Sequence, residues 1–133
     1  MRRGMASCTC CRANNLANLY YKGIAEQFVK KMGGVEEMKA QHANVGDVVV
    51  LRRGPRFIYG LVTKPWSRRS KPTYASMEAS LRALRTHVLK HDVRDIAMPR
   101  IGCGLDKLEW GPVRSLILRV FQGVPVRITV YTL

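Results

Sequence analysis

Short apolar runs alternate with amphipathic helical stripes over the last two thirds of the chain, and this alternation limits the fold more than any other feature. Strand-like runs lie at residues 47–53, 57–63, 95–98 and 126–133. Apolar residues at helical spacing fill residues 74–91 and 113–121. Strands that alternate with helices predict a three-layer α/β domain with a mixed, mostly parallel sheet.

The first two strands are predicted to form a hairpin. Val48–Leu51 is apolar throughout, which suits a strand buried on both faces. Gly54 and Pro55 then turn the chain, and Phe57–Thr63 returns.

The helical stripes have recognisable ends. Thr73 is a predicted N-cap for the stripe that begins at Tyr74, and Pro112 lies in the first turn of the later helix. Further helices are expected at about residues 24–32, ended by Gly33 and Gly34, and at about residues 35–42.

Residues 1–22 look like an irregular, basic leader, because no clear periodicity runs through them. Cys8, Cys10 and Cys11 crowd this segment, too close together for a disulfide framework. Zinc binding is one interpretation, but no second pair of ligands follows at finger spacing. Reduced thiols in a loose segment are the other, and they indicate an intracellular protein.

Composition supports a single domain with a buried core and no membrane span. The chain has 133 residues and is 47% hydrophobic, enough to bury a core and to exclude a disordered chain. The longest uncharged run, Ala13 to Tyr21, is too short to cross a membrane, which needs about 20 residues.

The net charge of +14 predicts an anionic partner. Nucleic acid and a phosphate-bearing ligand both satisfy this charge. Aromatic residues make up only 8% of the chain, and no recognisable nucleic-acid motif is present.

The loop Pro99–Asp106 follows a predicted strand and precedes a helix, where α/β sheets bind ligands. Gly102 and Gly104 permit a close approach of phosphate to the backbone, although a plain turn explains them as well. Arg100 is a phosphate partner or a solvated cation. Asp106 is a general base beside a ligand, or a turn or cap residue.

A second loop, Lys64–Thr73, is strongly basic. Crowding by Arg68 and Arg69 is expected to lower the pKa of a nearby lysine amine and so make it nucleophilic, which makes Lys71 a candidate. A solvated basic loop is the alternative. Trp66 stacks on a base or sugar, or only packs.

The string Met98–Asp106 resembles the signature loop of the macro-domain family. Within that family, the chain is most similar to the glycohydrolases that remove terminal ADP-ribose from proteins, which are also O-acyl-ADP-ribose deacylases. Agreement continues through Gly23–Ala25, Lys71–Tyr74 and Ile128–Leu133, and the resemblance covers residues 23–133. It therefore divides the chain into a divergent segment, 1–22, and a macro domain, 23–133.

The resemblance implies a hydrolase without metal or cofactor. Lys71 matches the lysine that attacks the distal ribose, and Asp106 matches the aspartate that resolves the lysyl intermediate. The implied ligand-binding residues are Arg100, Ile101, Gly102, Cys103, Gly104, Leu105 and Leu133. The implied partners are ADP-ribose, O-acyl-ADP-ribose and ADP-ribosylated proteins, in the nucleus and also the cytosol, within the DNA damage response.

The chain departs from the family pattern near its start. The family opens with a strand that ends in Gly-Asp-(Leu or Ile), and that aspartate selects adenine. No aspartate precedes Asp47 here, so the first strands are expected to be lost or replaced. An inactive ADP-ribose-binding module and a basic nucleic-acid-binding protein remain the alternative functions.

Overall fold

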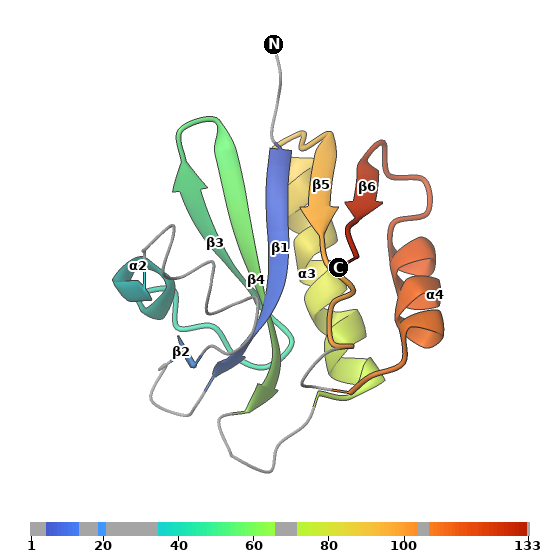
Figure 1. Cartoon of the computed structure of the whole chain (residues 1–133). Coiled ribbons are helices and arrows are strands. Elements are labelled where there is room, and N and C mark those ends of the chain that lie inside the picture. The colour runs from blue at the N-terminus through green and yellow to red at the C-terminus, as the bar shows by residue number, and fades with distance from the viewer. Residues whose placement is uncertain (1–4, 14–18, 21–34, 66–71, 104–106, 133) are drawn as a thin grey trace.

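The computed structural model describes residues 5–13, 19–20, 35–65, 72–103 and 107–132. Figure 1 shows the elements in these ranges: β1 (Met5–Ala13), β2 (Leu19–Tyr20), α2 (Val35–Lys39), β3 (Val48–Arg53), β4 (Arg56–Pro65), α3 (Tyr74–Lys90), β5 (Asp95–Met98), α4 (Trp110–Val120) and β6 (Arg127–Val130). The predicted helix at residues 24–32 lies outside the described residues.

The strands form one mixed sheet in the order β3-β4-β1-β5-β6, and the short β2 pairs with the end of β1. The pairs β4–β1, β1–β5 and β5–β6 are parallel, whereas β3–β4 and β1–β2 are antiparallel. The carboxyl ends of four parallel strands therefore meet at one end of the sheet (Figure 1). The predicted mixed, mostly parallel sheet is confirmed.

Strand β1 lies in the middle of this sheet, so the expected irregular leader is wrong for residues 5–13. It pairs with β4 from Ala6 to Ala13 and with β5 from Met5 to Ser7. Pairing to neighbours on both sides imposes an extended backbone on a sequence with few β-branched residues, because strand preference depends on context. The sheet thus contains backbone from both sides of the boundary expected between residues 22 and 23.

The predicted hairpin is confirmed, but β3 is an edge strand rather than one buried on both faces. Val49 and Leu51 are buried, while Val48 and Val50 are only partly buried. The side-chain amide of Gln41 closes part of the free edge: it donates to the carbonyl of Val50 at 2.7 Å and accepts from the Val50 N–H at 2.8 Å.

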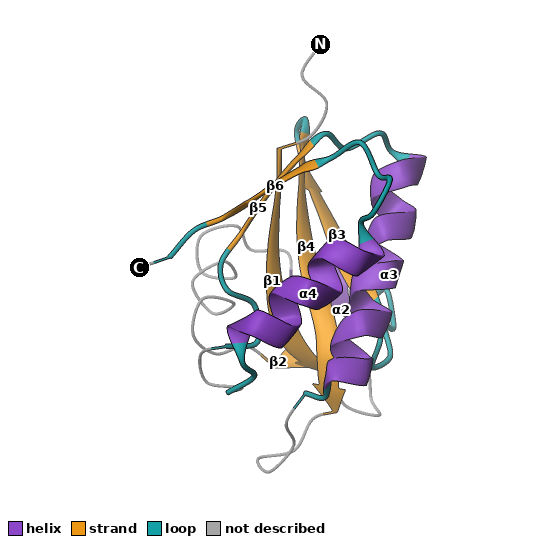
Figure 2. Cartoon of the chain, turned by 90° about the vertical axis from the view of Figure 1, so that its right-hand side faces the viewer, coloured by secondary structure: helices purple, strands orange, loops and turns teal. Residues whose placement is uncertain are grey.

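Figure 2 shows α3 and α4 side by side on one face of the sheet. Helix α3 faces the sheet with Met77, Leu81, Leu84 and Val88, as the helical stripe predicts, and each buried side chain contributes about 1.5–3 kcal/mol. Tyr74, counted in the same stripe, is exposed instead. The other layer of the predicted three-layer arrangement is not among the described helices.

No helix in the described ranges is both long enough and apolar enough to cross a membrane.

Candidate functional site

The candidate site lies where the parallel strands end. Strand β4 runs into residues 66–73, and β5 runs into the loop that begins at Pro99. Both strands end at the same end of the sheet, with β1 between them, so the two sequence-predicted loops begin at that end. Lys64 belongs to β4 and is buried, not part of the exposed loop as expected.

The loop after β5 is held by backbone hydrogen bonds. The N–H of Tyr131 donates to the carbonyl of Met98 at 2.8 Å, which extends the pairing of β5 with β6. The N–H of Cys103 donates to the carbonyl of Arg100 at 3.2 Å, and the N–H of Leu108 donates to that of Gly102 at 2.8 Å. These bonds tie residues 107–108 to the described start of the loop, where the side chain of Ile101 is buried.

Gly102 meets two demands that only glycine satisfies. Its φ of +74° lies in the left-handed region that L-residues rarely adopt. A Cβ at this position would lie 2.8 Å from Cε of Met77 and 3.0 Å from Cδ1 of Leu108. The glycine therefore lets α3 approach the loop closely, a packing role that the phosphate interpretation of the sequence did not include.

Cys103 is not built as a nucleophile. Burial raises the pKa of its thiol, and the opposing effect of the Arg100 cation is smaller. Its Sγ lies 3.3 Å from the carbonyl oxygen of Ile101, where the thiol donates a hydrogen bond. A neutral thiol at neutral pH leaves the chemistry to other residues.

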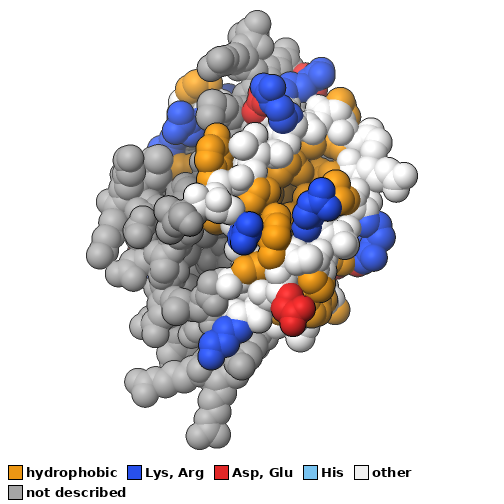
Figure 3. Space-filling model, turned by 45° about the vertical axis from the view of Figure 1, so that its right-hand side comes forward, with side chains coloured by type: hydrophobic (Ala, Val, Ile, Leu, Met, Phe, Trp, Pro, Cys, Tyr) orange, Lys and Arg blue, Asp and Glu red, His pale blue; other side chains and the backbone are white. Residues whose placement is uncertain are grey.

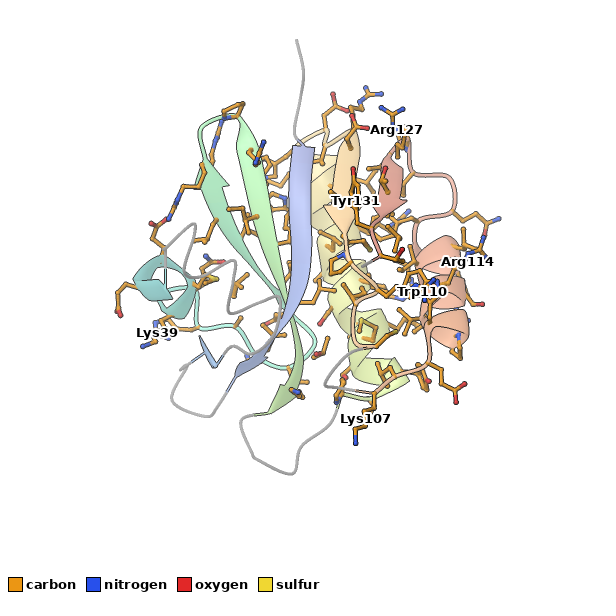
Figure 4. The ribbon with its side chains drawn as sticks, in the orientation of Figure 1. Lys39, Lys107, Trp110, Arg114, Arg127 and Tyr131 are labelled. Carbon is orange, nitrogen blue, oxygen red and sulfur yellow. The ribbon has the colours of Figure 1, made fainter. Side chains whose placement is uncertain are left out.

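Arg100 is exposed beside the loop and lies over the indole of Trp110, with Cζ 5.9 Å from the ring centroid. Trp110 begins α4, and Figure 4 shows it on that helix near Arg114, while Lys107 lies beyond the carboxyl end of the sheet. Stacking on an aromatic ring orients a guanidinium while its N–H groups stay free for an anion.

The start of α3 is fixed by a capping box. Oγ1 of Thr73 accepts from the N–H of Ser76, and Oγ of Ser76 accepts from the N–H of Thr73, both at 3.0 Å. The Ser76 hydroxyl also donates to the carbonyl of Thr63 at 2.6 Å, which ties the helix to the end of β4. Thr73 is thus the predicted N-cap, and Pro72 before it is buried.

Two contacts join this helix start to the loop after β5. The N–H of Glu109 donates to the hydroxyl of Tyr74 at 3.2 Å. One turn further along α3, Met77 packs against Gly102. Sequence reasoning missed the role of Tyr74, because it counted the residue as apolar. The signal was its polar hydroxyl at the first position after the cap.

Five of the predicted site residues lie outside the described part of the chain: Lys71, Gly104, Leu105, Asp106 and Leu133. Their neighbours in sequence are described. Tyr74 and Glu109 lie three residues after Lys71 and Asp106, respectively, and they are hydrogen-bonded to each other. The structure therefore brings together the chain on the carboxyl side of both candidate catalytic residues. Within the described residues, no cluster of metal-ligating side chains occurs.

Comparison with known proteins identifies the family of this chain. The family model "Macro domain" matches residues 11–117. The human protein named ADP-ribose glycohydrolase OARD1 is 50% identical over 111 residues, which cover 84% of this chain and 72% of that protein. The bovine protein of the same name matches equally.

Solved structures share the fold. The macrodomain of Mycobacterium tuberculosis DarG superimposes with a TM-score of 0.78 at 23% identity, covering 95% of this chain and 87% of that one. Thermosipho africanus DarTG, in complex with ADP-ribose, gives a TM-score of 0.75 at 17% identity, covering 97% of this chain and 38% of that one. The chain belongs to the macro domain family.

Proposed function

We propose that this chain is a hydrolase that binds ADP-ribose, removes it from acidic side chains of proteins and deacylates O-acyl-ADP-ribose. The family membership and the 50% identity to a named ADP-ribose glycohydrolase support this function. We assign the nucleophile to Lys71 and the base to Asp106. Arg100, Ile101, Gly102, Cys103, Gly104, Leu105 and Leu133 are the proposed ligand-binding residues.

The observation that carries the catalytic assignment is the hydrogen bond between Tyr74 and Glu109. It joins Tyr74 to Glu109, and Lys71 and Asp106 precede these two residues by three positions each in the sequence. A reaction that needs a nucleophile and a base on one substrate carbon requires such a fixed spacing. A basic loop that served only as a solvated surface would not require it.

In the first step, the neutral amine of Lys71 attacks the anomeric carbon of the distal ribose. A C–N bond forms while the C–O bond to the acyl group breaks, and the carboxylate leaves with the bonding electrons. The nitrogen then loses one proton to give a neutral glycosyl-lysine. One difficult displacement is in this way divided into two easier ones.

In the second step, Asp106 takes a proton from a water molecule as its oxygen attacks the same carbon. The C–N bond breaks, the lysine nitrogen regains a proton, and ADP-ribose is released. The exposed cation of Arg100 neutralises the diphosphate, and its stacking on Trp110 limits the orientations it samples.

The test is release of ADP-ribose from a peptide that is ADP-ribosylated on a glutamate side chain, followed by chromatography. We expect Lys71→Ala to lose at least about a thousandfold of turnover, since it removes the nucleophile. Asp106→Ala keeps the nucleophile, so we expect intact-protein mass spectrometry to find the covalent ADP-ribosyl adduct on the chain.

Lys90→Ala is the matched control, because Lys90 is an exposed lysine at the far end of α3. It should keep the turnover of the unmodified chain. Normal turnover by Lys71→Ala would refute the lysyl mechanism. Binding of ADP-ribose with no turnover by the unmodified chain would show a binding module instead.

A nuclear location is part of the same proposal, supported by the charge of +14 and the family resemblance. Microscopy of the fluorescently tagged chain in cells tests it. Exclusion of the tagged chain from the nucleus would refute it.

A further inference from the structure

Four aromatic side chains form a cluster at the end of the sheet where the parallel strands begin, opposite the candidate site. Figure 1 shows the β3–β4 turn, the end of α3 and the starts of β5 and β6 at this end. The aromatic cluster consists of Phe57 and Tyr59 from β4, His87 from the last turn of α3, and His91, the C-cap of that helix. None of these side chains takes part in the proposed hydrolysis.

The two imidazoles of the aromatic cluster stack, with ring centroids 4.1 Å apart and planes inclined by 23°. The Phe57 ring contacts both, with its centroid 4.9 Å from that of His87 and 5.4 Å from that of His91. The Tyr59 hydroxyl lies at hydrogen-bond distance, 2.7 Å, from Nδ1 of His87 and so orients that ring. The stack therefore leads from the buried Tyr59 to His91, which is exposed.

The outer imidazole, that of His91, is a platform for one more ring. One of its faces is covered by His87 and its side by Phe57, and no other ring among the described residues contacts it. Contacts on two sides limit the orientations of the side chain, so an incoming ring meets a partner that is already ordered. Nucleobases stack on such rings with little regard to sequence, because every base has a π-face.

Two exposed cations border the aromatic cluster. Arg52 lies directly opposite Phe57 in the β3–β4 pairing, and its Cζ is 5.6 Å from the centroid of that ring. Its Nε–H also donates to the carbonyl of Gly54 at 3.4 Å. Lys90 directly precedes His91 in the sequence. Neither cation forms an ion pair with any residue that the structure describes.

The carboxylates at this end of the sheet have other partners. Asp92 pairs with Arg94 at 2.9 Å, and Asp95 pairs with Arg127 at 2.8 Å. In Figure 3, basic and acidic side chains lie side by side at this end of the molecule. The positive charge beside the rings is therefore left for an external anion.

We propose that the aromatic cluster and its two cations bind single-stranded nucleic acid, with a base stacked on His91 and phosphates held by Arg52 and Lys90. Rings beside cations are the combination that holds single strands. An acidic peptide would use the cations alone, and the paired bases of a duplex offer no free face to a ring. The surface lies at the opposite end of the sheet from the candidate site, so this inference does not rest on the proposed function.

The test is fluorescence anisotropy of a fluorescein-labelled oligothymidine of about eight nucleotides, titrated with the full chain at about 100 mM salt. An excess of ADP-ribose is present throughout, to compete at the candidate site. We expect saturable binding. His91→Ala should weaken it at least about fivefold, because the stacking platform is removed, whereas His91→Phe keeps a ring and should stay within about twofold.

Two arginines of one hairpin test the charge. Arg52→Glu should weaken binding at least about tenfold, since it removes a phosphate partner and adds repulsion. Arg56→Glu makes the same change of net charge at an exposed residue on the face of β4 opposite Phe57, because neighbouring side chains alternate along a strand. That control should stay within about threefold of the unmodified chain. These variants locate the strand whether or not the chain binds ADP-ribose.

Proton NMR locates the base. A base stacked on His91 should shift the ring protons of this imidazole upfield, through the ring current of the base. The ring protons of His42, which is exposed after α2, should not move. An oligouridine of the same length is titrated in parallel. Binding of either strand supports the proposal, and the tighter one identifies DNA or RNA as the source.

Three results would overturn the proposal. The first is absence of saturable binding of either oligonucleotide to the unmodified chain. The second is binding that is unchanged in His91→Ala or in Arg52→Glu, or that leaves the His91 ring protons unshifted. The third is displacement of the oligonucleotide by polyglutamate at equal concentration of charge, which would assign the surface to an acidic protein segment.

Discussion

Gly102 in the candidate site is constrained both in its backbone conformation and in its packing. Its left-handed backbone and its contacts with Met77 and Leu108 bring α3 against the loop that precedes Asp106. Met77 is fully buried, so its methyl group has no solvent to move into. A side chain at residue 102 must therefore change the packing between helix and loop.

We predict that Gly102→Ala lowers the free energy of unfolding by about 2–4 kcal/mol, from backbone strain and overpacking together. Gly123→Ala is the control, since Gly123 has a φ of +80° and a Cβ added there would meet no atom within 4 Å. That change should cost about 1 kcal/mol. Urea denaturation of both variants measures the difference, and equal losses would show that the contacts with Met77 and Leu108 impose no cost.

His87 is the second residue whose properties depend strongly on its contacts. It accepts or donates a 2.7 Å hydrogen bond with the Tyr59 hydroxyl and packs against the rings of Phe57 and His91. Burial, with smaller effects of His91 and Lys90, lowers the pKa of His87 to about 4. The folded chain therefore keeps this imidazole neutral at a pH where an unfolded chain would protonate it.

Between pH 6.5 and pH 4 the unfolded chain binds more protons at His87 than the folded chain does. The free energy of unfolding should therefore fall as the pH is lowered through this window. We predict a smaller loss between pH 7 and pH 5 for His87→Asn, which keeps an amide for Tyr59 but does not titrate. Urea midpoints at the two pH values measure it. Identical pH dependence in the two proteins would contradict the assignment to His87.

At the scale of elements, helix α3 contacts the loop of the candidate site through its first two turns, and the start of this helix is capped. The Thr73–Ser76 box satisfies backbone groups that the first turn leaves free, and Ser76 anchors the turn to β4. The helix start is therefore coupled to the strand that precedes the basic loop.

We predict that Thr73→Ala lowers the free energy of unfolding by about 1 kcal/mol, because it removes the N-cap acceptor. Thr86→Ala is the matched control: its hydroxyl donates only to the carbonyl of Arg82, in the middle of the same helix. That substitution should stay within about 0.5 kcal/mol of the unmodified chain. Both are measured by urea denaturation, and a cap variant as stable as the control would contradict the role of Thr73.

The elements also show what sequence patterns can predict. Periodicity and turn chemistry gave α3, its N-cap Thr73, the β3–β4 hairpin and β5, because each has a local signal. Strand β1 has no such signal. Its extended form depends on pairing with Phe57–Pro65 and Asp95–Ala97, which are distant in sequence. The absence of charge from Met5 to Cys11 was the one hint of a central position.

The candidate site, too, could be predicted from the sequence only in part. The position of the Pro99–Asp106 loop at the end of a strand followed from the element order. The link between Tyr74 and Glu109 did not, because it joins residues from two helices' starts through tertiary packing. The close approach of Met77 to Gly102 could not be predicted either, because periodicity predicts that Met77 is buried but not which residue it contacts.

At the scale of the whole molecule, the net charge of +14 is consistent with two kinds of ligand, a diphosphate and a nucleic acid. Some cations are neutralised locally, as Arg53 is by Glu37 and Arg127 by Asp95. The remaining excess attracts any anion, so charge alone does not separate a diphosphate ligand from a nucleic acid. The two ligands differ physically, because only a nucleic acid carries a condensed layer of counterions.

We predict that the affinity for ADP-ribose changes by less than about tenfold between 50 and 200 mM salt. Salt screens the attraction of a single diphosphate, but binding this ligand releases no condensed layer of counterions. A nucleic acid bound through six to ten phosphates would lose about 10³–10⁵ in affinity over the same range, since each neutralised phosphate releases a counterion. Calorimetric titration with ADP-ribose and with a DNA duplex at both salt concentrations measures the two slopes. Binding of the duplex with the steep slope, without binding of ADP-ribose by the folded chain, would transfer the charge to nucleic-acid recognition and contradict the hydrolase. If the affinity for ADP-ribose depends only weakly on salt, the basic surface serves to attract anionic substrates toward the end of the sheet.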